Sequence, residues 1–203
     1  MIDFLQQTPA HDVRATLLLA HGAGAPMDSD FMNALTAALV VEGIEVLRFE
    51  FPYMAGRRQG GSKRPPDRAP VLLQAFAAAR EQAGGRRIFL GGKSMGGRMA
   101  TLLACEQDCR GVVCFGYPFH PPGKADKVRT GHLHEVRAPI LICQGERDPF
   151  GRREEVAGYD LPSTVTLHWL PDGNHDLVPR RASGVTAQDN LISAARAAAA
   201  FMG

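Results

Sequence analysis

The stretch Ile88-Phe89-Leu90-Gly91-Gly92-Lys93-Ser94-Met95-Gly96-Gly97 decides how the rest of the chain is interpreted. The apolar spacing predicts a short buried strand over Arg87–Leu90 and a helix from about Met95 to Cys105. Between them lies the pattern Gly-x-Ser-x-Gly, which is typical of a nucleophilic serine on a sharp strand-to-helix turn. Glycine is needed on both sides of the serine, because side chains there would collide where the strand meets the helix. The stretch therefore predicts an activated hydroxyl at Ser94, above the carboxyl end of a strand.

A phosphate-binding loop is the alternative interpretation of the same residues. Gly92-Lys93-Ser94 matches the end of the motif G-x-x-x-x-G-K-S. The first glycine of that motif would fall at position 87, which is Arg87. Ile88-Phe89-Leu90 would then have to cradle phosphate, although these residues are typical of a buried strand. A nucleotide site is therefore the weaker interpretation.

Apolar strands and helices alternate along the chain, as in a parallel sheet covered on both faces. The other predicted strands are Val13–Ala20, Ile44–Phe51, Gly111–Phe115, Pro139–Cys143 and Thr164–Leu170. The other predicted helices span Met27–Val41, about Asp67–Ala83, about Arg153–Ala157, and a last segment with a capping-box-like start at Thr186 and Asp189. Gly56–Pro66 is predicted to be a polar loop. The connection Gly116–Arg137 has room for at most one short helix, which leaves little material for a lid.

Composition predicts one folded domain over residues 1–203. The 203 residues are 45% hydrophobic and 22% charged, which excludes a disordered chain. The apolar stretches are too short to cross a bilayer and no secretory signal is visible, so we expect no membrane partner and a cytoplasmic location. A net charge of +2 argues against nucleic-acid binding. No C-x-x-C pair is present, and free thiols are expected at Cys105, Cys109, Cys114 and Cys143.

A nucleophilic serine needs a base and an acid that orients the base. In this type of sheet they are expected in the order Ser, Asp or Glu, His, each in a turn after a later strand. The turn after Pro139–Cys143 offers Asp148, with Glu146 as the alternative acid, and the turn after the last strand offers His175. Both turns lie on the same edge of the sheet as the serine. Asp172 and Asp176 are weaker candidates for the acid.

Backbone amides are the expected donors to an oxyanion. The amide of Met95 follows the serine at the start of a helix, where the helix dipole also favours negative charge. The second donor is expected in the small-residue loop after the first core strand, with Ala23 as first choice and Gly24 as second. His21 begins that loop, and a role in bracing it is expected rather than a catalytic one.

These motifs together resemble those of small α/β-hydrolases that lack a cap domain. The matching segments are His21-Gly22-Ala23-Gly24-Ala25, Gly91-Gly92-Lys93-Ser94-Met95-Gly96-Gly97-Arg98 and Gly116-Tyr117-Pro118-Phe119-His120-Pro121-Pro122-Gly123-Lys124. The chain is similar to the branch that includes testis-expressed protein thirty and the hydrolase-like domain of an NSL acetyltransferase complex subunit. It is also similar to dienelactone-hydrolase-like proteins, whose nucleophile is cysteine instead of serine. The resemblance implies an α/β-hydrolase fold with a mostly parallel sheet of about six or seven strands.

The function expected from these residues is hydrolysis of an ester, thioester or related acyl bond in a small soluble substrate. The mechanism would use a Ser-His-Asp triad and an acyl-enzyme. No cofactor is expected, and no metal, because no His or Cys cluster has ligand spacing. The alternative is a hydrolase-like interaction module with little or no catalysis, which the resemblance to scaffolding relatives keeps open. Oligomeric state is left open.

Two loops are expected to border the site. Gly56–Arg68 holds five Lys or Arg residues and one Asp, and it follows a strand at the carboxyl edge. Its Arg57 and Arg58 could attract an anionic substrate, although a solvated loop is the simpler interpretation. His120 lies in the loop after Gly111–Phe115 and could contact substrate, or the prolines beside it could only stiffen that loop.

Overall fold

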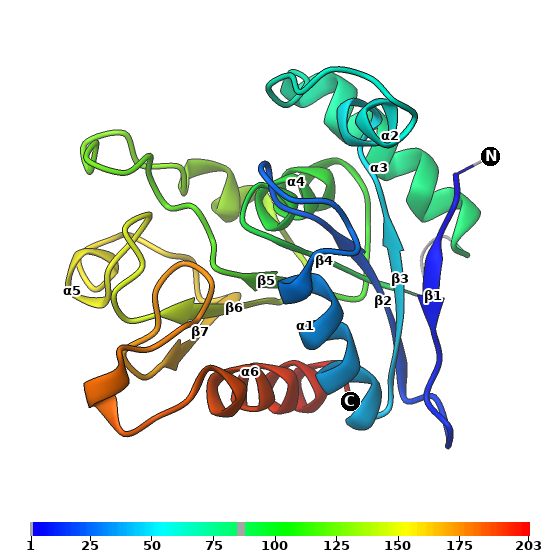
Figure 1. Cartoon of the computed structure of the whole chain (residues 1–203). Helices are drawn as coiled ribbons and strands as arrows, with labels where there is room; N and C mark the ends of the chain where they lie inside the picture. The colour runs from blue at the N-terminus through cyan, green and yellow to red at the C-terminus, as the bar shows by residue number, and fades with distance from the viewer. Residues whose placement is uncertain (1, 85–87) are drawn as a thin grey trace.

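A seven-stranded sheet runs through the protein in the computed structural model, which describes residues 2–84 and 88–203 (Figure 1). The strands are β1 (Leu5–Gln7), β2 (Ala15–Ala20), β3 (Ile44–Phe49), β4 (Phe89–Lys93), β5 (Val112–Phe115), β6 (Ile140–Gly145) and β7 (Val165–Leu170). Their order across the sheet is β1-β3-β2-β4-β5-β6-β7, and all neighbours are parallel except β1 and β3. The predicted α/β-hydrolase fold with a mostly parallel sheet is confirmed.

Helices cover both faces of this sheet (Figure 1). They are α1 (Asp30–Val41), α2 (Pro52–Arg58), α3 (Ala69–Gln82), α4 (Met95–Glu106), α5 (Arg153–Val156) and α6 (Ala187–Met202), with short 3₁₀ turns at Gly131–Glu135 and Arg181–Ser183. One apolar cluster packs the sheet against α1 and α6, and the other packs it against α3 and α4. No separate cap domain is evident over the described residues, and none of the described helices is long and apolar enough to cross a membrane.

Strand β2 shows why these apolar runs form a two-sided sheet. Side chains alternate across a strand, so neighbouring leucines face opposite layers. Leu18 packs in the α3 and α4 cluster, whereas Leu17 and Leu19 pack in the α1 and α6 cluster. All three are fully buried. A continuous apolar run is therefore what a strand with two covered faces requires.

Strand β1 was not among the predicted strands. It pairs antiparallel with β3 at the edge of the sheet, with Leu5 opposite Arg48. All three of its residues are exposed, so it carries no apolar alternation that a sequence pattern could detect. Strand β4 continues through two glycines to Lys93, beyond its predicted end at Leu90. Its predicted first residue, Arg87, lies outside the described residues.

The segment after β3 differs from the prediction. Gly56–Arg58 belongs to helix α2, although a loop was predicted from Gly56 onward. The helix predicted from about Asp67 begins later, because the N-cap of α3 is Arg68 and Asp67 lies before it. The Asp67 carboxylate accepts a hydrogen bond, 3.0 Å long, from the backbone N–H of Tyr53 in the first turn of α2. First-turn N–H groups lack partners within their own helix, and a carboxylate from a distant residue satisfies this one.

Candidate active site

The turn at Ser94 has the geometry that the glycine spacing predicted. Ser94 ends β4 and caps α4 with a φ of 52° and a ψ of −115°, outside the regions that side chains prefer. A Cβ atom on Gly92 would lie 2.3 Å from the carbonyl carbon of Gly96, and one on Gly96 would lie 2.5 Å from the Ala20 oxygen. The close approach of strand and helix therefore leaves room only for hydrogen at both glycines.

This crowding predicts a large stability loss in Gly92→Ala. The added methyl group meets backbone atoms, which can move only if β4 separates from α4, so we expect a loss of about 3 kcal/mol in unfolding free energy. Urea denaturation measures that loss. Gly131→Ala is the matched control, because a Cβ there meets nothing within 4 Å, and it should change stability little. Equal stability of the two variants would contradict this account of the turn.

The structure brings Ser94, His175 and Asp148 together from three separate loops. The Nε2 atom of His175 lies 2.8 Å from the hydroxyl of Ser94, and its Nδ1 atom lies 2.8 Å from Oδ2 of Asp148. An ionised carboxylate only accepts hydrogen bonds, so Nδ1 carries the ring proton. Nε2 is then left to accept from the serine hydroxyl. This chain of hydrogen bonds has the connectivity that nucleophilic catalysis by serine requires.

Buried donors hold the Asp148 carboxylate in place. The residue is 0% exposed, and its two oxygens accept from the Phe150 N–H at 2.8 Å and from the side-chain amide of Gln144 at 2.9 Å. Gln144 also donates to the carbonyls of Tyr117 and Gly151 and accepts from the Tyr117 N–H. The sequence analysis missed Gln144. Its only signal was a polar residue at the end of an otherwise apolar strand.

The other acidic candidates are paired elsewhere. Glu146 binds Arg153 at 2.6 Å and accepts from the backbone N–H of Asp172, and that backbone bond is the main cause that lowers its pKa. Asp172 pairs with Arg180 at 2.6 Å. Asp176 lies beside His175 in sequence, but its carboxylate faces a lysine instead of the imidazole Nδ1. Among the four candidates, Asp148 is the one in contact with the imidazole Nδ1.

Two side chains brace the loop that holds Ala23 and Gly24. The Nε2 atom of His21 accepts from the Phe51 N–H at 3.1 Å, so its Nδ1 donates to the Gly22 carbonyl at 2.7 Å. Burial lowers the pKa of His21, which keeps this ring neutral. The bracing role predicted for His21 agrees with these contacts.

Tyr53 adds a second brace, which the sequence analysis missed. Its hydroxyl donates to the Ala23 carbonyl at 2.9 Å. Over the described residues, the N–H groups of Ala23 and Met95 have no hydrogen-bond acceptor within the protein. A fixed peptide with a free N–H is what an oxyanion donor needs.

A pocket of about 320 Å³ opens beside Ser94 and His175. Its floor and walls are formed by the loop after β2, the start of α1 and the loops after β6 and β7. The large apolar side chains that line it are Phe31, Met32 and Phe150. The ring of Phe150 lies 4.2 Å from that of His175, centroid to centroid. The pocket can therefore hold a small group with an apolar part next to the serine hydroxyl.

His120 does not line this pocket. Its side chain is 2% exposed, with Nδ1 2.9 Å from the Pro121 carbonyl and Nε2 3.4 Å from the Glu155 carboxylate. It joins its loop to helix α5. This placement favours the structural interpretation of the loop over contact with substrate.

Arg57 and Arg58 do not line it either. They border a separate cavity of about 220 Å³. The guanidinium of Arg58 is held by Glu50 at 2.7 Å and by Asp28 at 2.8 Å, and these bonds raise its pKa. Arg57 donates to the Arg64 carbonyl. These contacts favour the interpretation of this segment as a structural, solvated one.

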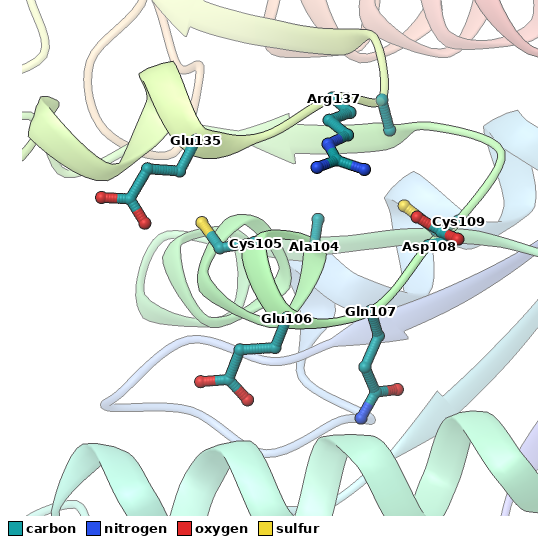
Figure 2. Close-up of a pocket in the computed structure, with 9 residues that line it drawn as sticks. Ala104, Cys105, Glu106, Gln107, Asp108, Cys109, Glu135 and Arg137 are labelled. Atoms are coloured by element: carbon teal, nitrogen blue, oxygen red, sulfur yellow. The ribbon is translucent and has the colours of Figure 1, made fainter.

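Another pocket, of about 480 Å³, lies at the far end of α4 from Ser94 (Figure 2). Twelve residues of helix correspond to about 18 Å, so the two sites are well separated. Figure 2 shows Cys105 and Cys109 among its lining side chains. Burial raises the pKa of both thiols, which makes them poor nucleophiles. No group of three His, Cys, Asp or Glu side chains in the described part of the chain could hold a metal ion.

Comparison with known proteins assigns this chain to a protein family. Residues 13–203 match the model of the family described as Alpha/beta hydrolase domain, so the chain belongs to that family. Three solved structures with a similar fold are an α/β serine hydrolase without a lid from Xanthomonas campestris, dienelactone hydrolase from Anabaena variabilis and Est1E from Butyrivibrio proteoclasticus.

The three structures share the fold over most of their length. The Xanthomonas protein is 23% identical, with a TM-score of 0.64, over 87% of this chain and 81% of that one. The Anabaena enzyme is 20% identical, with a TM-score of 0.68, over 97% of this chain and 88% of that one. Est1E is 14% identical, with a TM-score of 0.70, over 99% of this chain and 93% of that one.

Proposed function

We propose that this protein is a serine hydrolase that cleaves an ester, thioester or related acyl bond. The observation that carries the proposal is the continuous hydrogen-bonded chain from the Ser94 hydroxyl through His175 to the buried Asp148. A pocket beside the hydroxyl and free amides on either side of it support the same function. Membership in the α/β-hydrolase family agrees with it.

In the proposed mechanism the Ser94 oxygen attacks the acyl carbon while its proton moves to Nε2 of His175. The Asp148 carboxylate stabilises the imidazolium, and the Ala23 and Met95 amides bind the developing oxyanion, with Gly24 as the alternative donor. The imidazolium then gives its proton to the leaving alcohol or thiol. Water attacks the acyl-enzyme in the same way, and the acid and the free serine are restored.

The proposed substrate is a small molecule. The pocket next to Ser94 is open to solvent and has the volume of a short acyl group with some apolar surface. A preference for anionic substrates stays a prediction with little support, because Arg57 and Arg58 are engaged away from this pocket. We further propose that residues 1–203 work as one domain and belong to the testis-expressed protein thirty branch. The four unpaired cysteines fit a reducing, cytoplasmic location.

A fluorophosphonate probe tests the proposal directly. We expect mass spectrometry to find the label on Ser94 alone. Among the residues that the structure describes, Ser94 is the one whose hydroxyl contacts a histidine that is itself bonded to a buried carboxylate. A panel of p-nitrophenyl esters with neutral and carboxylate-bearing acyl groups of increasing length should show turnover of the short esters. Folded protein that takes no label and cleaves no ester would overturn the proposal and favour the interaction module.

A further inference from the structure

The loop after β2 turns two successive carbonyl groups toward one buried hydroxyl. The carbonyl of Ala23 accepts from the Tyr53 hydroxyl at 2.9 Å, and the carbonyl of Gly22 accepts from it over a longer distance of 3.3 Å. The Gly22 carbonyl also accepts from Nδ1 of His21 at 2.7 Å. Both peptides are therefore held from the side on which Tyr53 lies.

The orientation of these carbonyls fixes the direction of the next two N–H groups. In a planar trans peptide the C=O and the N–H point to opposite sides of the chain, and both peptides are trans. The N–H of Ala23 shares a peptide with the Gly22 carbonyl, and the N–H of Gly24 shares one with the Ala23 carbonyl. Both N–H groups therefore point away from Tyr53.

The side away from Tyr53 is the pocket beside Ser94. Tyr53 is fully buried in the apolar cluster that packs the sheet against α3 and α4. It does not line the pocket, whereas Ala23, Gly24 and Ser94 do. A Cβ atom on Gly22 would lie 3.7 Å from the Cβ of Ser94, so the loop passes directly beside the serine turn. Over the described residues, the Gly24 N–H has no acceptor in the backbone, as for Ala23.

The Tyr53 hydroxyl is itself held firmly. The backbone N–H of Tyr53 donates to the Asp67 carboxylate at 3.0 Å, and its ring packs 5.9 Å from the ring of His21, centroid to centroid. Burial raises the pKa of Tyr53 to about 12, so the hydroxyl keeps its proton at neutral pH. It is therefore a fixed hydrogen-bond donor.

The two peptides differ in the number of donors that hold them. The Gly22 carbonyl accepts from both His21 and Tyr53, whereas the Ala23 carbonyl accepts from Tyr53 alone among the described side chains. Loss of the Tyr53 hydroxyl should therefore loosen the Gly24 N–H more than the Ala23 N–H. This difference separates the contributions of the two amides.

We propose that Tyr53 is a positioning residue of the oxyanion site, and that the Ala23 and Gly24 amides bind the oxyanion together instead of one replacing the other. The inference rests on the proposed function, in which Gly24 is only the alternative to Ala23. With the Met95 amide, the oxyanion would then have three donors. An ester carbonyl oxygen offers two lone pairs and an oxyanion offers three, so the additional donor stabilises the tetrahedral intermediate more than the bound ester.

Tyr53→Phe removes the hydroxyl and keeps the ring. We expect kcat for a short p-nitrophenyl ester to fall about 10- to 100-fold, which is less than the loss for deleting a donor, because the Gly24 amide is loosened and still present. KM should change by less than about twofold, since the lost interaction belongs to the transition state. If Ala23 acts alone, kcat should fall by less than about threefold, and that result would overturn the inference.

Thr101→Val is the matched control. The Thr101 hydroxyl is also fully buried and also donates to a backbone carbonyl, that of Arg98, at 2.8 Å. Its removal should cost a similar amount of stability in urea and leave kcat within about twofold of the wild-type value. Equal losses of kcat in the two variants would give Tyr53 a general structural role and contradict the inference.

Backbone amide relaxation, measured by nuclear magnetic resonance in the free protein, tests the positioning without turnover. We expect the Gly24 order parameter to be about 0.85 in the wild-type protein and below about 0.6 in Tyr53→Phe, with a smaller change at Ala23. An unchanged value at Gly24 would overturn the positioning role. A wild-type protein that takes no fluorophosphonate label would overturn the proposed function alone, since amide relaxation does not depend on catalysis.

A second variant decides if Tyr53→Phe fails to fold. Gly24→Pro deletes the N–H itself, at an exposed position where a Cβ meets nothing within 4 Å. We expect kcat to fall at least as far as the value given for Tyr53→Phe. A Gly24→Pro variant with wild-type kcat would show that this amide does not bind the oxyanion.

Discussion

Ser94→Ala is expected to lose about 10⁵- to 10⁶-fold in kcat for a short p-nitrophenyl ester. The substitution removes the oxygen that we propose forms the acyl-enzyme and leaves the amides of the proposed oxyanion site in place. A residual rate of order 10³ to 10⁴ over water is therefore expected from those amides and from binding. Steady-state assays with protein purified apart from any wild-type enzyme measure the loss.

The fold of Ser94→Ala should be unchanged, because alanine keeps the Cβ atom and the same backbone strain at this turn. Circular dichroism and thermal unfolding serve as the check. A folded variant that kept wild-type turnover would place the nucleophile elsewhere. Alanine substitution of Ser29, which also lines the pocket but has no contact with the imidazole, is the matched control and should retain activity.

Asp148→Asn is expected to lose about 10⁴-fold in kcat. The carboxylate accepts from the Phe150 N–H, from Gln144 and from the imidazole. An amide in its place turns its NH₂ group either toward the Phe150 N–H or toward Gln144 and the imidazole. In the second orientation the ring carries its proton on Nε2 and can no longer accept the proton of the serine.

Glu146→Gln separates this role from a general effect of lost charge. Glu146 lies two residues away and is bound to Arg153, so its substitution should change kcat by no more than a few fold. An inactive Glu146→Gln variant together with an active Asp148→Asn variant would show that Asp148 is not the acid that orients the imidazole. Ester hydrolysis measured at several pH values distinguishes a lost base from a weakened one.

The placement of the three proposed catalytic side chains could be predicted from sequence because it depends on strand ends. Parallel strands place their carboxyl ends at one edge, so residues that follow β4, β6 and β7 meet wherever the sheet forms. The serine turn, Asp148 and His175 all follow from that rule. The need for glycine at positions 92 and 96 follows from the turn itself.

The supporting contacts could not be predicted, because they join segments far apart in the chain. The Tyr53 hydroxyl donates to the carbonyl of Ala23, which is 30 positions away in the sequence. The Lys93 ammonium donates to the carbonyl of His175, which is 82 positions away. The contacts of the arginines after β3 could not be predicted for the same reason. Their charges find partners such as Asp28 in a distant loop, and no local pattern indicates that pairing.

The strained backbone at Ser94 makes serine a destabilising residue at this position. A non-glycine residue at a φ of 52° and a ψ of −115° costs of order 1 to 3 kcal/mol, and glycine would relieve most of that cost. Selection for stability therefore acts against the serine, and only selection for its hydroxyl can retain it. In a descendant that had become a pure binding module, we expect this position to drift toward glycine before the buried residues around Asp148 change.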